Sequence, residues 1–200
     1  PHFTFNLMNS IQNYVLDNDT DKALLYISNF SKLIRAALDY SNQKNILLEE
    51  EIKFLVNYVD LQNMRFGDRV KFIIKYPEEH AHNILIPSMI IQPLIENVFV
   101  HAFSSAIKNP LLEVNIYAED PISDANTLLI DVKDNGVGRS NKKINTHLSK
   151  GLSIVQERLQ LINKTNKTSI ELKYFDLKEI DPNTSGTKVQ LKVPLQLLKK

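Results

Sequence analysis

The first 75 residues or so show the spacing of amphipathic helices. Apolar side chains recur every three or four positions between Phe3 and Tyr14, and again between Lys22 and about Tyr40. The cluster Asn18-Asp19-Thr20-Asp21 lies between the two stretches and combines turn formers with helix-capping residues. The pattern therefore predicts two helices joined as a hairpin.

The second of these helices is apolar along two separate stripes. A helix with two apolar stripes must bury both of them. One stripe can face the hairpin partner, and the other then needs either a second chain or the next domain. Two such helices from each of two chains make a four-helix bundle, so this helix predicts a homodimer. The stripes consist of Ala23, Tyr26, Phe30, Leu33 and Ala37, and of Leu24, Ile27, Ile34 and Leu38.

The remainder of the chain predicts a mixed α/β unit. A third helix is expected over 48–66, where Glu49, Glu50 and Glu51 in the first turn suit the positive end of the helix dipole. Alternating and continuous apolar runs predict strands, and longer periods predict two more helices. We place a first domain over 1–45 and a second over 46–200. The strands are expected over 70–76, 111–118, 128–132, 169–175 and 188–193, and the helices over 87–103 and 151–161.

The composition excludes several kinds of binding site and catalysis. The 200 residues include 24 basic and 23 acidic side chains, a net charge of +1, which gives no basic excess for binding nucleic acid. The chain has no cysteine, so disulfides, thiolate catalysis and cysteine-based zinc sites are excluded.

The chain begins with Pro1 rather than methionine, which predicts either a piece of a longer protein or a processed product. Its most apolar run, 84–100, is interrupted by Pro87 and Pro93, and a membrane-spanning helix needs about 18 or more apolar residues in succession. We expect neither a membrane span nor a signal peptide within these residues.

Four of the five glycines lie between positions 136 and 186. Two of them belong to Asp134-Asn135-Gly136-Val137-Gly138, directly after a predicted strand. A Gly-x-Gly turn lets the backbone approach a flat or anionic ligand, because no Cβ stands in the way. A carboxylate just before it can accept a hydrogen bond from an exocyclic amine. Asp-Asn-Gly is also a common tight turn, so that interpretation stays open.

Gly151 is predicted to start a helix after a polar, basic loop that ends at Lys150. Helix N-termini bind phosphate through their free N–H groups and the helix dipole. A flexible loop with a glycine as helix breaker explains the same residues.

The helix predicted over 87–103 carries Asn97 and His101, four residues apart and hence neighbours at the edge of its apolar face. An amide oxygen is a suitable ligand for Mg²⁺, which commonly bridges a protein oxygen and nucleotide phosphates. Ordinary placement of polar residues at the solvent boundary is the alternative for each residue alone.

The order of these features resembles a known ATP-binding domain. Glu96-Asn97 and His101 on a helix, the Asp-x-Gly-x-Gly turn after a strand, a glycine near a helix start and Gly186-Thr187 before a closing strand follow one another. This order is similar to that of histidine kinases, gyrase-type topoisomerases, MutL-like repair proteins and the related heat-shock chaperones. The resemblance implies an α+β fold, in which helices pack on one face of a mixed sheet as a two-layer α/β sandwich.

The N-terminal sequence narrows the resemblance. Pro-His-Phe-Thr-Phe-Asn at 1–6 is similar to the Pro-His-Phe-x-Phe-Asn motif of LytS-type sensor histidine kinases. Ile-Gln-Pro-Leu-Ile-Glu-Asn at 91–97 and Gln-Glu-Arg-Leu at 156–159 also resemble that family. Each motif is short, but the resemblance that they carry extends over nearly the whole chain.

The resemblance implies a role for each matching residue. His2 is the expected acceptor of the γ-phosphoryl group, since imidazole is a competent nucleophile near neutral pH. Asn97 is expected to hold Mg²⁺, His101 to face the phosphates, and Glu96 to assist proton movement or orient the site.

At the other end of the expected pocket, Asp134 is expected to accept a hydrogen bond from the adenine amino group. Gly136 and Gly138 are expected to shape the pocket. Thr187 supports the adenine end. Lys150, Gly151 and Leu152 are expected along the phosphates.

The family also implies partners. The expected ligands are ATP and Mg²⁺, and the expected activity is autophosphorylation on His2 followed by transfer to an aspartate in the receiver domain of a response regulator. The chain is then the cytoplasmic part of a homodimeric sensor that is anchored in the membrane elsewhere.

Two alternative functions stay open, and departures from the family pattern favour the first of them. Val98-Phe99-Val100 lacks a frequent lysine, Ala102 replaces a frequent glycine, and the second glycine motif is reduced to Ser149-Lys150-Gly151. These departures allow a non-catalytic ATP-binding module that signals by dimer rearrangement. An ATPase of the gyrase or MutL group fits least, because those proteins lack the Pro-His-Phe-x-Phe-Asn element.

Overall fold

The computed structural model describes residues 11–12, 14–16, 18–104, 107–118, 127–138, 146–166, 169–194 and 196–197. Side chains are described for these residues except 146–154, 166 and 196–197. His2 therefore lies outside the described residues.

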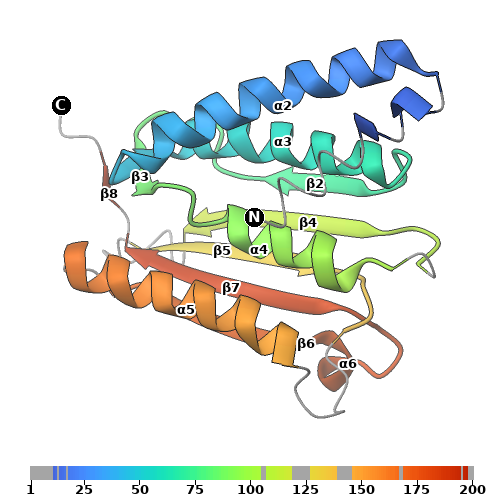
Figure 1. The fold of residues 1–200 in the computed structure, drawn as a ribbon. Helices are drawn as coiled ribbons and strands as arrows, with labels where there is room; N and C mark the ends of the chain where they lie inside the picture. Colours follow the sequence, from blue (N-terminus) through green and yellow to red (C-terminus); the bar gives the residue numbers. More distant parts are fainter. Residues whose placement is uncertain are drawn as a thin grey trace.

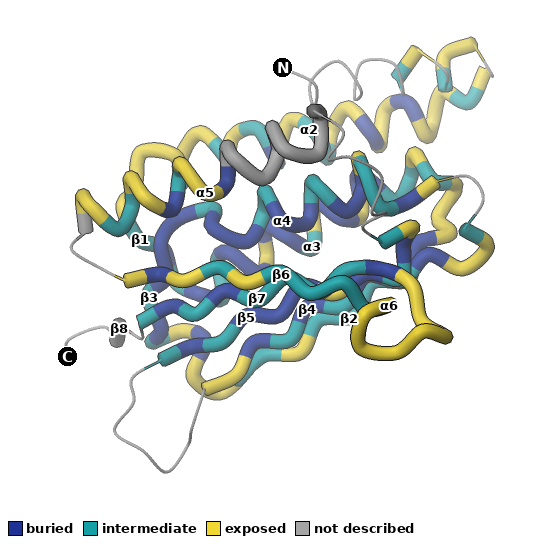
Figure 2. Tube along the Cα trace, turned by 90° about the horizontal axis from the view of Figure 1, so that it is seen from below, coloured by how far each residue is buried: buried dark blue, intermediate teal, exposed yellow. Residues whose placement is uncertain are grey.

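A five-stranded mixed sheet forms the centre of the molecule, in the order β2-β4-β5-β7-β6. β2 runs parallel to β4, and the other neighbours are antiparallel. Helices α3, α4 and α5 lie on one face of this sheet, as Figures 1 and 2 show. The predicted sandwich of helices on a mixed sheet is confirmed. The strands are β2 (Lys71–Lys75), β4 (Leu111–Ala118), β5 (Thr127–Asp134), β6 (Glu171–Asp176) and β7 (Thr187–Pro194).

The core lies between the sheet and the helices because the strands alternate. The buried apolar side chains of β4 and β5 point to the helices, while Glu113 and Lys133 pair at 3.7 Å on the other face. The core residues of these strands and helices include Leu112, Val114, Leu128, Ile130, Val132, Phe54, Leu55, Tyr58, Leu94, Ile95, Val155 and Leu159.

Helix α2 (Thr20–Ser41), which the apolar period predicts over 22–40, packs on α3 (Leu48–Arg65). Asp19 caps α2 by accepting the backbone N–H of Lys22 at 3.1 Å. Tyr26 and Leu33 are buried, so one of the two apolar stripes faces the core. Leu24 and Leu38 of the other stripe are 60% and 61% exposed.

The structure differs from the predicted helix over 87–103. Residues Ile84–Pro87 form strand β3, which pairs with β1 (Asn45–Leu47) and β8 (Gln196–Leu197) in a second, small sheet. α4 (Gln92–Asn97) begins only after a turn in which Met89 has a positive φ of 54°. It continues as a π-helical turn, η1 (Val98–Ala102). The proline of the first helical turn is therefore Pro93, not Pro87.

The predicted start of a helix at Gly151 is wrong. α5 runs over Thr146–Asn166, so Lys150, Gly151 and Leu152 lie within the helix rather than at its N-terminus. The residues from 146 to 150 include neither glycine nor proline, so no helix breaker holds the start back to position 151. A short helix, α6 (Leu177–Ile180), follows β6. None of the described helices combines the length and apolarity needed to span a bilayer.

Two asparagines fix the start of the segment that follows their helix. The side chain of Asn63 donates to the carbonyl of Val70 at 3.0 Å and accepts its N–H at 2.9 Å. Asn163 bonds Ile170 in the same way, at 2.9 and 2.8 Å. In each connection between helix and strand, the side chain of one asparagine thus bonds the backbone of the residue seven positions later.

Asn63→Ala and Asn163→Ala are each expected to lower the free energy of unfolding by about 1–3 kcal/mol, because a partly buried backbone amide loses its partner. Urea titration followed by circular dichroism measures this. Gln160→Ala, at an exposed position of α5, is the control and should stay within about 0.5 kcal/mol of the wild type. Equal stability of the asparagine variants and the control would contradict the assignment.

Candidate functional site

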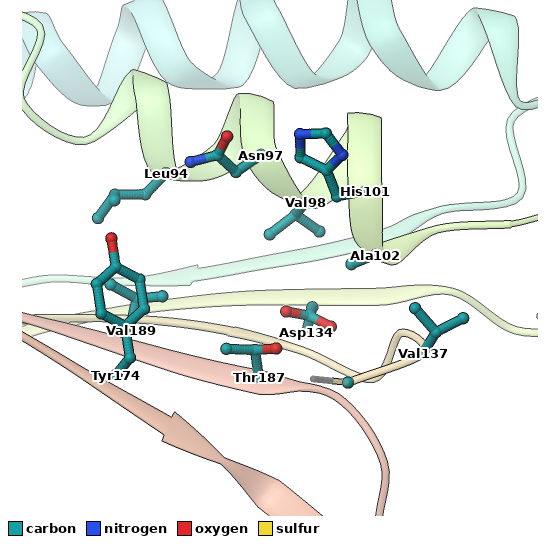
Figure 3. Close-up of a pocket in the computed structure, with 11 residues that line it drawn as sticks. Leu94, Asn97, Val98, His101, Ala102, Asp134, Val137, Tyr174, Thr187 and Val189 are labelled. Carbon is teal, nitrogen blue, oxygen red and sulfur yellow. The ribbon is translucent and has the colours of Figure 1, made fainter. Parts of the chain in front are cut away.

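A pocket opens between the helical segment α4–η1 and the strands β5, β6 and β7, with side chains entering it from both sides (Figure 3). Five residues singled out from the sequence line it. They are Asn97, His101, Asp134, Gly138 and Thr187. The structure therefore brings together residues separated by up to 90 positions in the chain.

Asp134 lies on the sheet side of the pocket, as the last residue of β5. It is in phase with Ile130 and Val132, so the alternation of the strand turns its side chain to the helix-covered face. Its Oδ1 accepts the N–H of Gly136 at 2.8 Å, and the N–H of Thr187 also bonds it. The carboxylate is thus held by two backbone donors and retains acceptor capacity for a ligand.

Burial is the main influence on the acidity of Asp134. It raises the pKa of this carboxyl from 3.8 to about 6, and the charge of Asp176 adds to the rise. The backbone N–H groups of Gly136 and Thr187 lower the pKa, and so limit the shift. Above pH 6 the group is therefore a charged acceptor in a recess with mainly apolar walls.

The glycines allow the backbone segments around Asp134 to approach one another. A Cβ at Gly136 would lie 2.5 Å from the carbonyl oxygen of Ala102, and the next N–H, of Val137, donates to that oxygen at 3.1 Å. Gly186 has a φ of +113°, and a Cβ there would overlap the carbonyl oxygen of Asp134. The turn after β5 thus packs directly against the end of η1 and the start of β7.

Asn97 and His101 lie on the helical side of the pocket, across from Asp134 and Thr187 (Figure 3). The π-helical turn begins just after Asn97 and includes His101, and such turns often occur at functional sites. Glu96 does not line the pocket. Its charge acts on Tyr58 of α3, where burial first and Glu96 second raise the pKa of the phenol.

The residues Phe99 and Val100 also lie away from the pocket. Phe99 is buried in an aromatic cluster, with its ring centroid 5.5 Å from that of Phe66 and 5.8 Å from that of Phe103. Phe99 therefore belongs to the core packing between α3 and η1, whereas Val100 is half exposed. Ala102, in contrast, does line the pocket.

The apolar walls of the pocket were not predicted from the sequence. They include Tyr174 and Val189, which are register partners on β6 and β7. The alternation of these strands could have indicated them, because both point to the same face. The other lining residues outside the prediction are Leu94, Val98, Ala102 and Val137.

The donor set fits Mg²⁺ that arrives with a nucleotide. Among the described residues no three His, Asp or Glu side chains gather as a metal cage. Mg²⁺ in nucleotide sites is usually held by one or two protein oxygens, phosphates and water. Asn97 offers one such oxygen at the pocket. The side chains of Lys150, Gly151 and Leu152 lie outside those described, so their expected place along the phosphates stays a prediction.

Comparison with known proteins bears on the family. Residues 1–70 match the model of the family described as Histidine kinase. The chain is 32% identical over 157 residues to the sensor histidine kinase/phosphatase LytS of Staphylococcus aureus strain MRSA252, which covers 78% of this chain. The chain belongs to the LytS-type histidine kinases. This agrees with the resemblance of the three sequence motifs.

Other relatives extend this comparison. The sensor protein LytS of Staphylococcus epidermidis strain ATCC 12228 is 29% identical over 146 residues, 73% of this chain. The chain spans about a quarter of the length of these two LytS proteins, 26% and 24%.

In fold, the chain is similar to the histidine kinase domain of the Erythrobacter litoralis EL346 blue-light activated kinase. That match has a TM-score of 0.52 and 15% identity, and it covers 90% of this chain and 82% of that one. Mycobacterial sensor histidine kinase MprB matches with a TM-score of 0.50 and 15% identity, over 77% of this LytS-type chain and 98% of that chain.

Proposed function

We propose that this chain is the catalytic core of a two-component sensor histidine kinase, which binds Mg–ATP in the pocket and phosphorylates His2. The observation that carries the proposal is that Asp134 and Asn97 line the same pocket from opposite sides. Asp134 supplies a buried, charged acceptor for the adenine amino group, and Asn97 supplies the amide oxygen for the metal. The apolar walls between them suit a flat base.

In the proposed reaction, a ring nitrogen of His2 forms a bond to the γ-phosphorus of ATP. The bond from that phosphorus to the bridging oxygen breaks, and ADP leaves with the electron pair. The imidazole proton passes to a base, for which Glu96 is the proposed residue, or to water. Asn97 would hold Mg²⁺, which would neutralise charge on the phosphates, and Asn97 and His101 orient these groups. The phosphoryl group then passes to an aspartate of a receiver domain.

We propose that the core acts as a homodimer through the outer face of α2. Three apolar side chains there, Leu24, Ile27 and Leu38, are between 41% and 61% exposed along one side of the helix. Such a stripe favours burial against a second copy of the same helix. In the longer sensor, this core is proposed to lie on the cytoplasmic side of the membrane.

We also propose a functional division near residue 45. β1 begins at Asn45 and pairs with β3 of the second part. α2, in the first part, rests on α3 through Tyr26 and Leu33. In this proposal, residues 1–45 provide dimerisation and the phosphoacceptor, and 46–200 bind ATP.

The test is incubation of the longer protein that contains this chain with γ-labelled ATP and Mg²⁺. We expect label on the protein that is stable in base and lost in acid, as for a phosphorylated imidazole, and no label in His2→Ala. Nucleotide binding without any label would favour the non-catalytic module. Label that persists in His2→Ala would overturn the assignment of the acceptor.

The affinity for adenosine is expected to fall about tenfold per pH unit below pH 6. The pKa of Asp134 is raised to about 6, so the folded protein takes up this proton as the pH falls below that value and loses the charged acceptor. Adenosine is used because it has no phosphates. Calorimetric titration between pH 5 and 8 measures the profile.

His101→Gln removes the imidazole that lines the same pocket, and so distinguishes its contribution to the pH profile from that of the Asp134 carboxyl. This variant should keep the decline below pH 6. A flat profile in the wild type, or a decline that disappears in His101→Gln, would contradict the role of Asp134.

A further inference from the structure

The segment that leads into α4 is held by a buried carboxylate from a different helix. Glu51 of α3 is fully buried. Its Oε2 accepts the N–H of Met89 at 2.9 Å, and its Oε1 accepts the N–H of Ile91 at 3.1 Å. The first-turn acid that the sequence assigned to the dipole of its own helix therefore serves the start of another.

This contact supplies what α4 lacks in its own sequence. Ile91 stands at the N-cap position and has no side chain that can accept a hydrogen bond there. Met89 has a positive φ of 54°, a conformation that a non-glycine residue keeps only when its surroundings fix it. The carboxylate of Glu51 satisfies the amides on both sides of Ile90, and places negative charge at the positive end of α4.

A second charged side chain reaches the same segment from α5. A guanidinium nitrogen of Arg158, in the Gln-Glu-Arg-Leu motif, donates to the carbonyl oxygen of Ser88 at 3.1 Å. Its charge also opposes the effect of burial on Glu51, where burial raises the pKa to about 7. Ser88 in turn donates from its hydroxyl to the carbonyl oxygen of Tyr40 near the end of α2 at 2.6 Å. Residues 88–91 are thus tied to α2, α3 and α5 at once.

We propose that Glu51 is a positioning residue for the pocket, fixing the start of α4 and thereby where Asn97 lies relative to Asp134. Arg158 supports the same segment from α5. Asn97 is six residues beyond Ile91 on one short, continuous helical stretch, so a displacement at the start of α4 carries over to it. This inference rests on nucleotide binding in the pocket.

The test compares Glu51→Gln with Glu49→Gln, at pH 8. Glu49 is in the same first turn but is only partly buried, and it pairs with Lys53 at 3.4 Å. Both variants make the same chemical change. Two ligands are titrated into each: a non-hydrolysable ATP analogue with Mg²⁺, and adenosine. Partners that orient a metal ligand typically contribute ten- to hundredfold in affinity.

We expect Glu51→Gln to bind the Mg–nucleotide at least about tenfold more weakly while its adenosine affinity changes less than twofold, because Asp134 is not displaced. Glu49→Gln should match the wild type with both ligands. Equal losses for both ligands would indicate a merely structural role and overturn the proposal, as would no loss at all.

Amide hydrogen exchange without nucleotide tests the clamp separately. We expect the amides of Met89 and Ile91 to exchange at least about tenfold faster in Glu51→Gln, with little change at Leu55 in the middle of α3. If the wild type binds neither ligand, the proposed function fails, and exchange alone decides whether Glu51 holds this segment. If Glu51→Gln does not fold, Arg158→Gln takes its place in the ligand comparison and must show the same difference between the two ligands. Equal losses there would overturn the proposal.

Discussion

Asp134→Asn is expected to bind a Mg–ATP analogue about ten- to hundredfold more weakly than the wild type. A hydrogen bond to a charged group contributes about 1.5–3 kcal/mol, and every 1.4 kcal/mol is a factor of ten in affinity. The Asn side chain has one acceptor oxygen in place of two, while the Gly136 and Thr187 N–H groups already bond this side chain. The amide nitrogen of the Asn side chain is a donor. It must then face either these N–H groups or the adenine amino group, which are donors too, so one hydrogen bond is lost. Isothermal titration calorimetry at pH 8, with Mg²⁺ in excess, measures the loss.

The matched control is Asp131→Asn, three residues earlier on β5. Asp131 is on the opposite face of the strand, where it pairs with Lys188 at 2.7 Å and accepts from Gln190 at 2.8 Å. The same chemical change there should leave nucleotide affinity within about threefold, although it removes a partly buried ion pair. If Asp134→Asn stays folded and also binds within threefold of the wild type, Asp134 is not the adenine acceptor.

Gly186→Ala is expected to lower the free energy of unfolding by at least about 3 kcal/mol. The φ of +113° disfavours any L side chain, and the new Cβ would overlap the carbonyl oxygen of Asp134. Relief would require β5 and β7 to separate at the pocket, and strain of this kind accounts for the large end of single-mutation effects. Denaturant unfolding followed by circular dichroism measures the change.

Gly67→Ala separates backbone strain from the clash. Gly67 also has a positive φ, +64°, but a Cβ there meets nothing within 4 Å. We expect a loss of only about 1–2 kcal/mol for this variant, the cost of the left-handed conformation alone. Equal losses at the two positions would show that the close approach of Gly186 to Asp134 contributes nothing.

Much of the fold could be predicted from the sequence, where one apolar period persisted over many residues. α2, α3, β4 and β5 were placed to within a few residues for this reason. Residues 87–91 precede the helix although the sequence predicts a helix over 87–103, because a short apolar run does not distinguish a strand from a helix by its period. The conformation of this segment is decided by pairing with β1 and by the buried Glu51, which are contacts between residues distant in the chain.

The polar residues of the candidate site were predictable where a motif combined with a period. Asp134 continues the buried phase of β5, and Asn97 and His101 are four apart on one helix, so the pocket contains all three. The period gave no warning that Glu96 lies outside the pocket lining and acts by its charge on Tyr58, because Tyr58 belongs to another helix. Strand alternation could have placed Tyr174 and Val189 on the helix-covered face, but that they are neighbours depends on the pairing of β6 with β7, which the sequence alone does not reveal.

The central claim is that a nucleotide occupies the pocket between α4–η1 and β5, β6 and β7. The most direct measurement is an amide NMR titration of the ¹⁵N-labelled chain with Mg²⁺ and a non-hydrolysable ATP analogue. We expect the largest shifts at Asn97, Gly136, Gly138 and Thr187. Shifts confined to the second cavity, around Leu111, Leu177 and Ile180, or no shifts at all in the folded protein, would contradict the central claim.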